Sequence, residues 1–167
     1  MTTKLVKFLL LVGLLLFFFP CLVFSANKAD AVVVDKSDAR LYLMKQGRKY
    51  ASFSVTFGRE PKGHKQQRGD ERTPEGHYTL DYKKSNSAYY KSIHISYPNA
   101  QDRENARKLG VDPGGDIMIH GQANGWEWAS IFVQFFNWTD GCIALTNHDM
   151  DRVWEAVDSG IPIEIKP

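Results

Sequence analysis

The N-terminal apolar segment decides how much of this chain is left to fold. Two lysines, at positions 4 and 7, precede an unbroken apolar run over residues 8–19, which ends at Pro20. Val23 and Ser25 are small enough to precede a signal-peptidase cleavage point. A basic start, an apolar run and small residues before the cleavage point are typical of a secretory signal peptide. We predict a signal peptide over residues 1–25 and one folded domain over residues 26–167.

Two alternatives for the N-terminal segment stay open. Cys21 could be a lipid-attachment cysteine, although the proline before it fits such a site poorly. The apolar run also continues through Leu22 and Val23 and approaches the length that spans a bilayer, so an uncleaved anchor is the second alternative. We expect the domain in the periplasm, with membrane contact through this segment only.

Length and charge describe the rest of the chain. After the signal segment, the remainder has the length of one domain and can bury a substantial core. The segment carries two of the 21 basic residues and none of the 19 acidic ones, so the domain is close to neutral. It has no basic tract or stripe, which argues against a nucleic-acid partner.

The chain has two cysteines, Cys21 and Cys142. If Cys21 leaves with the signal peptide, Cys142 is a single thiol in a compartment where thiols tend to be oxidised. It cannot form an internal disulfide. A lone thiol in a secreted protein is either reactive or linked to another chain, whereas the simpler interpretation is a buried cysteine that acts as a small apolar residue.

Short β patterns dominate the domain. Residues 50–57 alternate, with Phe53, Val55 and Phe57 on one face. Pro162 favours an edge position for the last strand. Residues 58–72 are polar and indicate a surface loop. The predicted strands cover residues 31–34, 40–43, 50–57, 76–82, 92–96, 117–120 and 161–165.

Three helices are predicted. One covers residues 100–109, with Asn99 as its N-cap and Gly110 as its stop. A second covers the apolar residues 128–136, packed on the sheet. A third begins at Thr146, which forms a capping-box pattern with Asp149, and reaches about Val157. The fold class is therefore β-rich α+β, a mixed sheet or sandwich with a few helices.

Two segments place a reactive side chain beside a glycine at the end of a short apolar strand. They are Ile117-Met118-Ile119-His120-Gly121 and Trp138-Thr139-Asp140-Gly141-Cys142-Ile143-Ala144-Leu145-Thr146-Asn147. Glycine allows unusual dihedrals and close approach of a substrate. Backbone N–H groups at Gly141 and Cys142 could then stabilise a substrate oxyanion.

The pair of Cys142 and His120 suggests nucleophilic catalysis. A free thiol is mostly protonated at neutral pH, with a pKa near about 8.5. A nearby imidazolium favours the thiolate and can lower the thiol pKa below about 7. The same histidine can then give its proton to the leaving amine. We expect the carbonyl of Gly121 to orient the other ring nitrogen of His120.

The chain resembles the L,D-transpeptidase catalytic-domain family, in a proteobacterial branch with a Thr-Asp-Gly-Cys motif. The resemblance rests on Ile119-His120-Gly121 and on residues 139–147. It is strengthened by Thr73-Pro74-Glu75-Gly76-His77-Tyr78, and by the segments over residues 94–99 and 112–116. It covers essentially the whole domain, and the combined motifs are far more specific than a lone Cys/His pair.

This resemblance implies a β-rich fold and a two-step acyl transfer on peptidoglycan stem peptides. Cys142 would attack the diaminopimelate carbonyl of a tetrapeptide and expel D-alanine. The acyl group would pass to an amine, forming a 3–3 crosslink or attaching a protein. No metal or cofactor is implied. The residues expected to contact substrate are His94, Tyr97, Thr139 and Asp140; His94 could instead be an ordinary strand residue, and Asp140 could instead cap a turn.

The sequence departs from the family at Ala144, where many members have an arginine two residues after the cysteine. This departure leaves recognition of the substrate carboxylate open, and the acyl acceptor with it. An L,D-carboxypeptidase, or an amidase that cleaves stem-peptide or wall-to-lipoprotein links, is therefore an alternative. An inactive wall-binding module is another, and a wall-linked lipoprotein is a possible partner. Sortases also use a histidine, a cysteine and a later arginine, here Arg152, but the glycines beside His120 and Cys142 fit them poorly.

Several other side chains have simpler interpretations. We expect His64 to be solvated in its polar loop and His148 to be structural in a first helical turn. A zinc site at Cys142 lacks closely spaced Cys/His ligands. Three aromatic residues could form a substrate-facing lid, although an apolar helix is more often part of a core: Trp126, Trp128 and Phe132.

Overall fold

The structure, a computed structural model, describes residues 28–126 and 134–167. The predicted signal peptide lies outside the described residues, as does most of the predicted helix over residues 128–136. Its last three residues, 134–136, form a turn. No helix in these two described ranges is long and apolar enough to cross a membrane.

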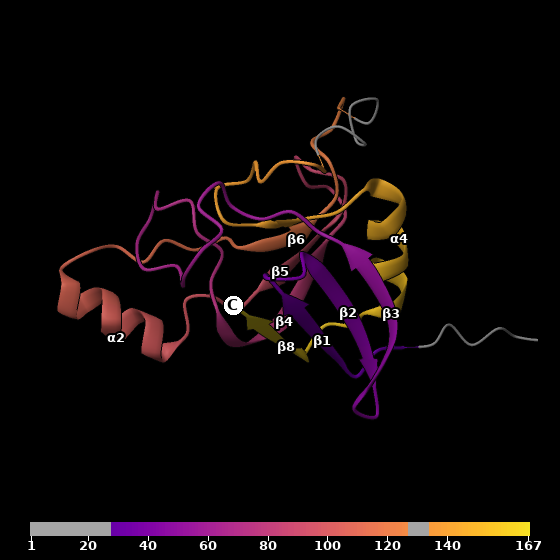
Figure 1. Cartoon of the computed structure of the whole chain (residues 1–167), viewed down its shortest axis with the longest axis horizontal. Coiled ribbons are helices and arrows are strands. Elements are labelled where there is room, and N and C mark those ends of the chain that lie inside the picture. The colour runs from indigo at the N-terminus through magenta and orange to yellow at the C-terminus, as the bar shows by residue number, and fades with distance from the viewer. Residues whose placement is uncertain (1–27, 127–133) are drawn as a thin grey trace, which may run out of the picture.

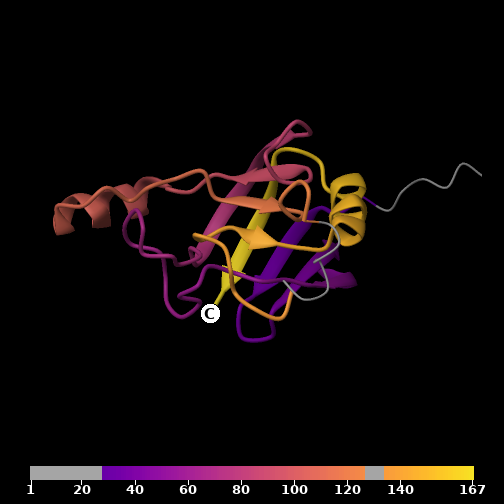
Figure 2. The same ribbon diagram turned by 90° about the horizontal axis from the view of Figure 1, so that it is seen from above.

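One mixed, eight-stranded sheet forms the body of the domain (Figures 1 and 2). Its spatial order is β3-β2-β1-β8-β4-β5-β6-β7. The pairs β1–β8 and β6–β7 are parallel, and the other neighbours are antiparallel. This confirms the predicted β-rich α+β class. The strands are β1 (Ala31–Asp35), β2 (Arg40–Lys45), β3 (Arg48–Ser54), β4 (Gly76–Lys84), β5 (Ser92–Ile95), β6 (Met118–His120), β7 (Ile143–Ala144) and β8 (Ile161–Lys166).

In the described part of the chain, two helices accompany the sheet. The helix α2 (Ala100–Leu109) begins at Asn99, which forms a reciprocal capping box, and ends at Gly110 in the left-handed conformation. The helix α4 (Asn147–Ala156) begins at Thr146, whose hydroxyl accepts the N–H of Asp149. Both helices confirm the prediction. In Figures 1 and 2, α4 lies against the sheet, whereas α2 projects from the body of the domain.

The core lies between one face of the sheet and α4. Met150, Val153 and Val157 cover this face from the helix, at the predicted spacing. Alternate residues of each strand face the core, so the intervening residues face away from it. Its largest fully buried side chains are Phe57, Leu41, Leu43, Leu80, Ile93, Ile95, Ile119, Ile143, Leu145, Met150, Ile163 and Ile165.

The predicted edge position of Pro162 is wrong, because β8 lies inside the sheet between β1 and β4. Pro162 faces Thr79 of β4. The backbone N–H and C=O of Thr79 are both bonded to Ser96. Pairing with β1 starts only at Ile163. The missing N–H of proline therefore removes no ladder bond at this position.

Candidate active site

The parallel pairing of β6 with β7 places His120 and Cys142 on neighbouring strands. Ile119 faces Ile143, and both side chains point into the core. His120 faces Ala144, so Cys142 lies one diagonal step from His120 on the opposite side of the sheet from the core. The two predicted catalytic side chains are thus brought together by strand register, although 22 positions separate them in the sequence.

His120 is held from one side. Its side chain is buried, and Nδ1 lies 2.6 Å from the carbonyl oxygen of Gly121, the contact expected from the sequence. Position 121 has no room for a side chain, because an added Cβ would lie 2.6 Å from Asn147 Oδ1 and 2.8 Å from the Tyr90 carbonyl oxygen. Glycine therefore allows the chain after β6 to pack tightly while its carbonyl reaches back to the ring.

Cys142 is held by backbone groups at the start of β6 and just before it. Its Sγ accepts the Met118 N–H at 3.4 Å, and the thiol donates to the Asp116 carbonyl oxygen at 3.7 Å. Within the described residues, Sγ makes no hydrogen bond with His120. The resting pair is therefore adjacent but not directly bonded, as is common for such pairs without substrate.

Both groups are neutral in the resting structure. Burial raises the pKa of Cys142 to about 11, and Asp140 and Asp116 act in the same direction. Burial lowers the pKa of His120 to about 4, although the hydrogen bond that its ring donates to the Gly121 carbonyl acts in the opposite direction. In this state desolvation penalises both charges, so the lowering of the thiol pKa by an imidazolium stays a prediction.

The turn before Cys142 is held together by Thr139. Its buried hydroxyl donates to the Cys142 carbonyl at 2.7 Å and accepts the Gly141 N–H at 3.2 Å. Two expectations are therefore corrected. The Thr139 hydroxyl faces its own turn rather than a substrate, and the Gly141 N–H is already bonded. The Cys142 N–H stays the predicted oxyanion donor.

An aromatic wall, which the sequence did not reveal, covers His120. The Tyr89 ring lies 4.2 Å from the His120 ring centroid, and the Trp138 ring lies 5.7 Å from it. Burial raises the pKa of Tyr89, and the charge that Cys142 gains when it is deprotonated acts in the same direction. Trp138 precedes the recognised motif directly, but no local pattern singles out Tyr89.

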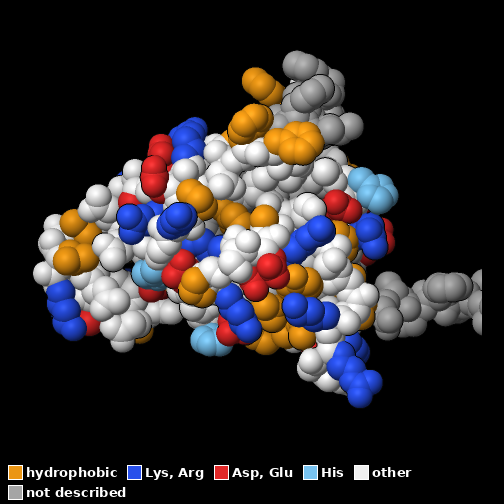
Figure 3. Space-filling model, in the orientation of Figure 1, with side chains coloured by type: hydrophobic (Ala, Val, Ile, Leu, Met, Phe, Trp, Pro, Cys, Tyr) orange, Lys and Arg blue, Asp and Glu red, His pale blue; other side chains and the backbone are white. Residues whose placement is uncertain are grey.

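An apolar cavity of about 310 Å³ adjoins this wall and is lined by Gln122, Ala123, Trp126 and Trp138. Figure 3 shows hydrophobic side chains projecting from the top of the molecule. Trp126 and Phe135 are among the exposed aromatic residues. Trp128 and Phe132, the other two residues of the predicted lid, lie outside the described residues.

A polar cavity of about 400 Å³ is lined in part by Asp140, two positions before Cys142, and by Ile117, which precedes the Met118 whose N–H Sγ accepts. Asp140 is 80% exposed on its rim and pairs with Arg59 at 2.7 Å. Its predicted contact with substrate stays a prediction that this position allows. The cavity is lined by Lys65, Arg68, Gly69, Glu71, Gly114, Gly115, Ile117 and Asp140.

His94 lies on the same side of the sheet as His120, paired in register with Met118. A bulge in β4 sets two residues, Asp81 and Tyr82, opposite it. His94 Nδ1 lies 2.6 Å from Asp81 Oδ1, and the Tyr82 ring stacks on His94 at 4.5 Å. Its predicted role in substrate binding therefore stays a prediction, with an oriented ring on the appropriate face.

Tyr97 is not part of the site. Its ring is buried in the core, and its hydroxyl donates to the Pro113 carbonyl at 3.0 Å. The expected substrate contact is therefore corrected, because the ring packs edge-on against Tyr78 and His64 instead of facing the nucleophile.

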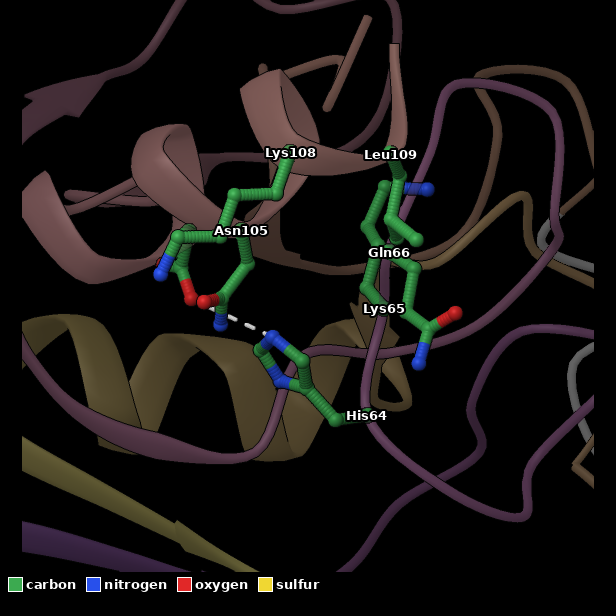
Figure 4. A pocket seen from close by; sticks show the side chains of 7 residues that line it. His64, Lys65, Gln66, Asn105, Lys108 and Leu109 are labelled. Carbon is green, nitrogen blue, oxygen red and sulfur yellow. Dashed lines mark ion pairs between the residues drawn. The ribbon is translucent and has the colours of Figure 1, made fainter. Parts of the chain in front are cut away.

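His64 is not simply solvated, contrary to the prediction. Its Nδ1 accepts the Glu75 N–H at 3.0 Å, and its Nε2 lies 3.1 Å from Asp102 Oδ1. Figure 4 shows His64 reaching toward Asn105 and Lys108 of α2, across a hollow of about 270 Å³. The ring thus ties the polar loop to α2, where its sequence alone showed no partner.

His148 is largely exposed in the first turn of α4, 3.6 Å from Asp149. In the part of the chain that the structure describes, no three His, Cys, Asp or Glu side chains form a cluster that could hold a metal ion. The site is thus made of a thiol, an imidazole, backbone groups and two cavities.

A family model for the L,D-transpeptidase catalytic domain (YkuD) matches residues 29–165. The chain belongs to this family. An L,D-transpeptidase from Xylanimonas cellulosilytica DSM 15894 (residues 123–326) shares the fold at 13% identity, with a TM-score of 0.54. The match covers 84% of this chain and 62% of that one.

Two further relatives are larger proteins. YafK of Escherichia coli (strain K12), named as a candidate L,D-transpeptidase, is 35% identical over 101 residues, which is 59% of this chain and 33% of YafK. The helical cell shape determining protein Pgp2 of Campylobacter jejuni is 26% identical, with a TM-score of 0.62, over 82% of this chain and 48% of Pgp2. This L,D-transpeptidase-family chain therefore spans a third to a half of these relatives.

Proposed function

We propose that this L,D-transpeptidase-family domain transfers the diaminopimelate acyl group of a peptidoglycan tetrapeptide through Cys142. The supporting observation is the diagonal pairing of Cys142 with His120, whose Nδ1 is held by Gly121. Because Nδ1–H donates to a carbonyl, the neutral ring has its lone pair on Nε2. That atom can accept the thiol proton.

In the first step, Sγ attacks the carbonyl carbon while its proton moves to His120 Nε2. The developing oxyanion accepts the Cys142 N–H. The C–N bond then breaks, and His120 returns the proton to the departing D-alanine amine, which leaves a thioester on Sγ. In the second step an acceptor amine attacks the thioester and gives a proton to His120, which restores the thiol.

The acceptor distinguishes a transpeptidase from a hydrolase. A diaminopimelate amine gives a 3–3 crosslink, a lysine amine attaches a protein, and water gives L,D-carboxypeptidase or amidase activity. Ala144 leaves this choice open, because it is fully buried and its backbone is paired with Thr56 in both directions. We place the protein in the periplasm, and extend to it a role in cell shape by analogy with the name of Pgp2.

The test is incubation of the purified protein with disaccharide tetrapeptides, followed by mass spectrometry. Crosslinked dimers indicate transpeptidation, and tripeptide without dimer indicates hydrolysis. Cys142→Ala should abolish both, and His120→Ala should slow acylation by about 10²- to 10⁴-fold. The absence of both products and of an acyl adduct on Cys142 would show the proposal to be wrong and favour an inactive wall-binding module.

A further inference from the structure

The loop over residues 58–72 brings two cations, Lys65 and Arg68, to the polar cavity that Asp140 also lines. Figures 1 and 2 show this loop next to the segment that joins α2 to β6. The Arg68 N–H donates to the Asp112 carbonyl at 2.7 Å, and Arg68 Nε lies 2.7 Å from Asp112 Oδ2. Gly114 approaches Arg68 so closely that an added Cβ would lie 3.3 Å from its Cα. The Arg68 backbone is therefore fixed at this wall.

The guanidinium of Arg68 is held by one ion pair, which leaves its other donors available. Asp112 holds only Nε, and the side chain remains 70% exposed. A guanidinium carries five N–H donors, and its two terminal nitrogens form the fork that binds a carboxylate in a bidentate manner. The contact with Asp112 restrains the guanidinium of a residue that lines the cavity.

Lys65 is the second cation of this wall. Its side chain is only 3% exposed, and Nζ donates to Asp70 at 2.7 Å and to the Gln67 carbonyl at 3.1 Å. An ammonium group has a third donor. Lys65 lines the same cavity as Arg68, and its charge acts against the burial that raises the pKa of Cys142.

The acidic residues of the cavity are partly neutralised. Arg59 contacts Glu71 at 2.9 Å and Asp140 at 2.7 Å, so both carboxylates share one cation. Asp70 also accepts three backbone N–H groups besides Lys65. The forked donors of Arg68 are thus the groups most suited to an incoming anion.

We propose that Arg68, supported by Lys65, binds a free carboxylate of the peptide substrate in this cavity and supplies the cation that position 144 lacks. The proposal rests on the proposed function for the substrate class. Two carboxylates of a tetrapeptide are candidates for binding to Arg68. One belongs to the terminal D-alanine, and the other lies at the far end of the diaminopimelate side chain.

The first experiment uses the full-length chain as the enzyme. It measures turnover of a tetrapeptide in which these two carboxylates are free. Arg68→Gln should raise KM by about tenfold to a hundredfold with a smaller change in kcat, because it removes a charge-assisted bidentate contact. Arg68→Lys should recover part of the loss. Arg107→Gln on α2, where the arginine pairs with Glu104, is the matched control and should change neither parameter.

Two further substrates, each amidated at one carboxylate, identify the bound group. The wild-type protein should lose affinity for the amide that removes the bound carboxylate, and Arg68→Gln should cause no additional loss there. If Arg68→Gln raises KM by the same factor for the acid and for both amides, the proposal is overturned.

Binding to the Cys142→Ala variant separates this proposal from the catalytic one. Calorimetry with the same three peptides requires no turnover. A preference for the free acid that disappears when Arg68→Gln is added supports the carboxylate site, even if the wild-type protein turns over none of the peptides. Equal binding of the acid and both amides overturns it, whatever the activity.

Discussion

The carbonyl oxygen of Gly121 lies 2.6 Å from Nδ1 of the preceding residue, His120. A carbonyl only accepts hydrogen bonds, so the contact assigns the ring proton to Nδ1. It leaves Nε2 as the basic nitrogen. One backbone group thus performs the orienting role that a carboxylate performs in other nucleophile–histidine sites.

Alkylation of Cys142 should be slow at neutral pH. With a thiol pKa of about 11, only about one molecule in 10⁴ carries the thiolate at pH 7. The rate with iodoacetamide should therefore rise about tenfold per pH unit up to that range, and stopped-flow or mass-spectrometric time courses can follow it. If the alkylation rate levels off below pH 8, the resting site does not hold a protonated Cys142 beside an uncharged His120.

Acid should destabilise the fold partly through His120. Its pKa falls from about 6.5 in the unfolded chain to about 4 in the fold, so the unfolded chain takes up the proton first. Stability is fully present above about pH 6.5 and is lost as the pH falls toward 4. Between pH 7 and 4.5, urea unfolding should show a loss about 2–3 kcal/mol larger for the wild type than for His120→Gln. Equal losses would refute this assignment.

Gly121→Ala should destabilise the protein by about 1–3 kcal/mol, because its Cβ would overlap Asn147 and the Tyr90 carbonyl. Gly115→Ala is the matched control. There the added Cβ meets its nearest atom at 3.8 Å, and the backbone φ is outside the left-handed range. Chemical unfolding of both variants checks the difference, and equal stabilities would argue against the close packing behind β6.

Thr139→Val should cost about 1–3 kcal/mol, since it leaves the Gly141 N–H and the Cys142 carbonyl without their shared partner. Thr139→Ser keeps the hydroxyl and should retain most of the stability. The measurement is again urea unfolding. Equal stabilities of Thr139→Val and Thr139→Ser would show that the hydroxyl does not hold the turn. A contact between this hydroxyl and substrate would then again be the favoured interpretation.

Much of the fold was predictable from local patterns. Alternation marked the strands, and Asn99, Gly110 and Thr146 marked helix boundaries that the structure confirms. The edge position predicted from Pro162 was wrong. A missing N–H costs stability only where a carbonyl on the neighbouring strand needs it as a hydrogen-bond donor. At this position Thr79 is bonded to Ser96 instead.

Within the site, the sequence indicated His120, Cys142 and the Gly121 carbonyl, because strand-end glycines and the family motif lie close to them. It misplaced Tyr97 and Thr139, whose polar groups satisfy partners inside the protein. Partners that lie far away along the chain leave no local signal.

The sequence by itself determined the fold class, the family and the two side chains proposed to react, since strand alternation, helix caps and motifs are properties of neighbouring residues. Only the tertiary structure decided the protonation of the pair, because desolvation depends on everything packed around Cys142 and His120. It also decided which cations line the polar cavity. Arg68 is brought to that cavity by its contact with Asp112, 44 positions away.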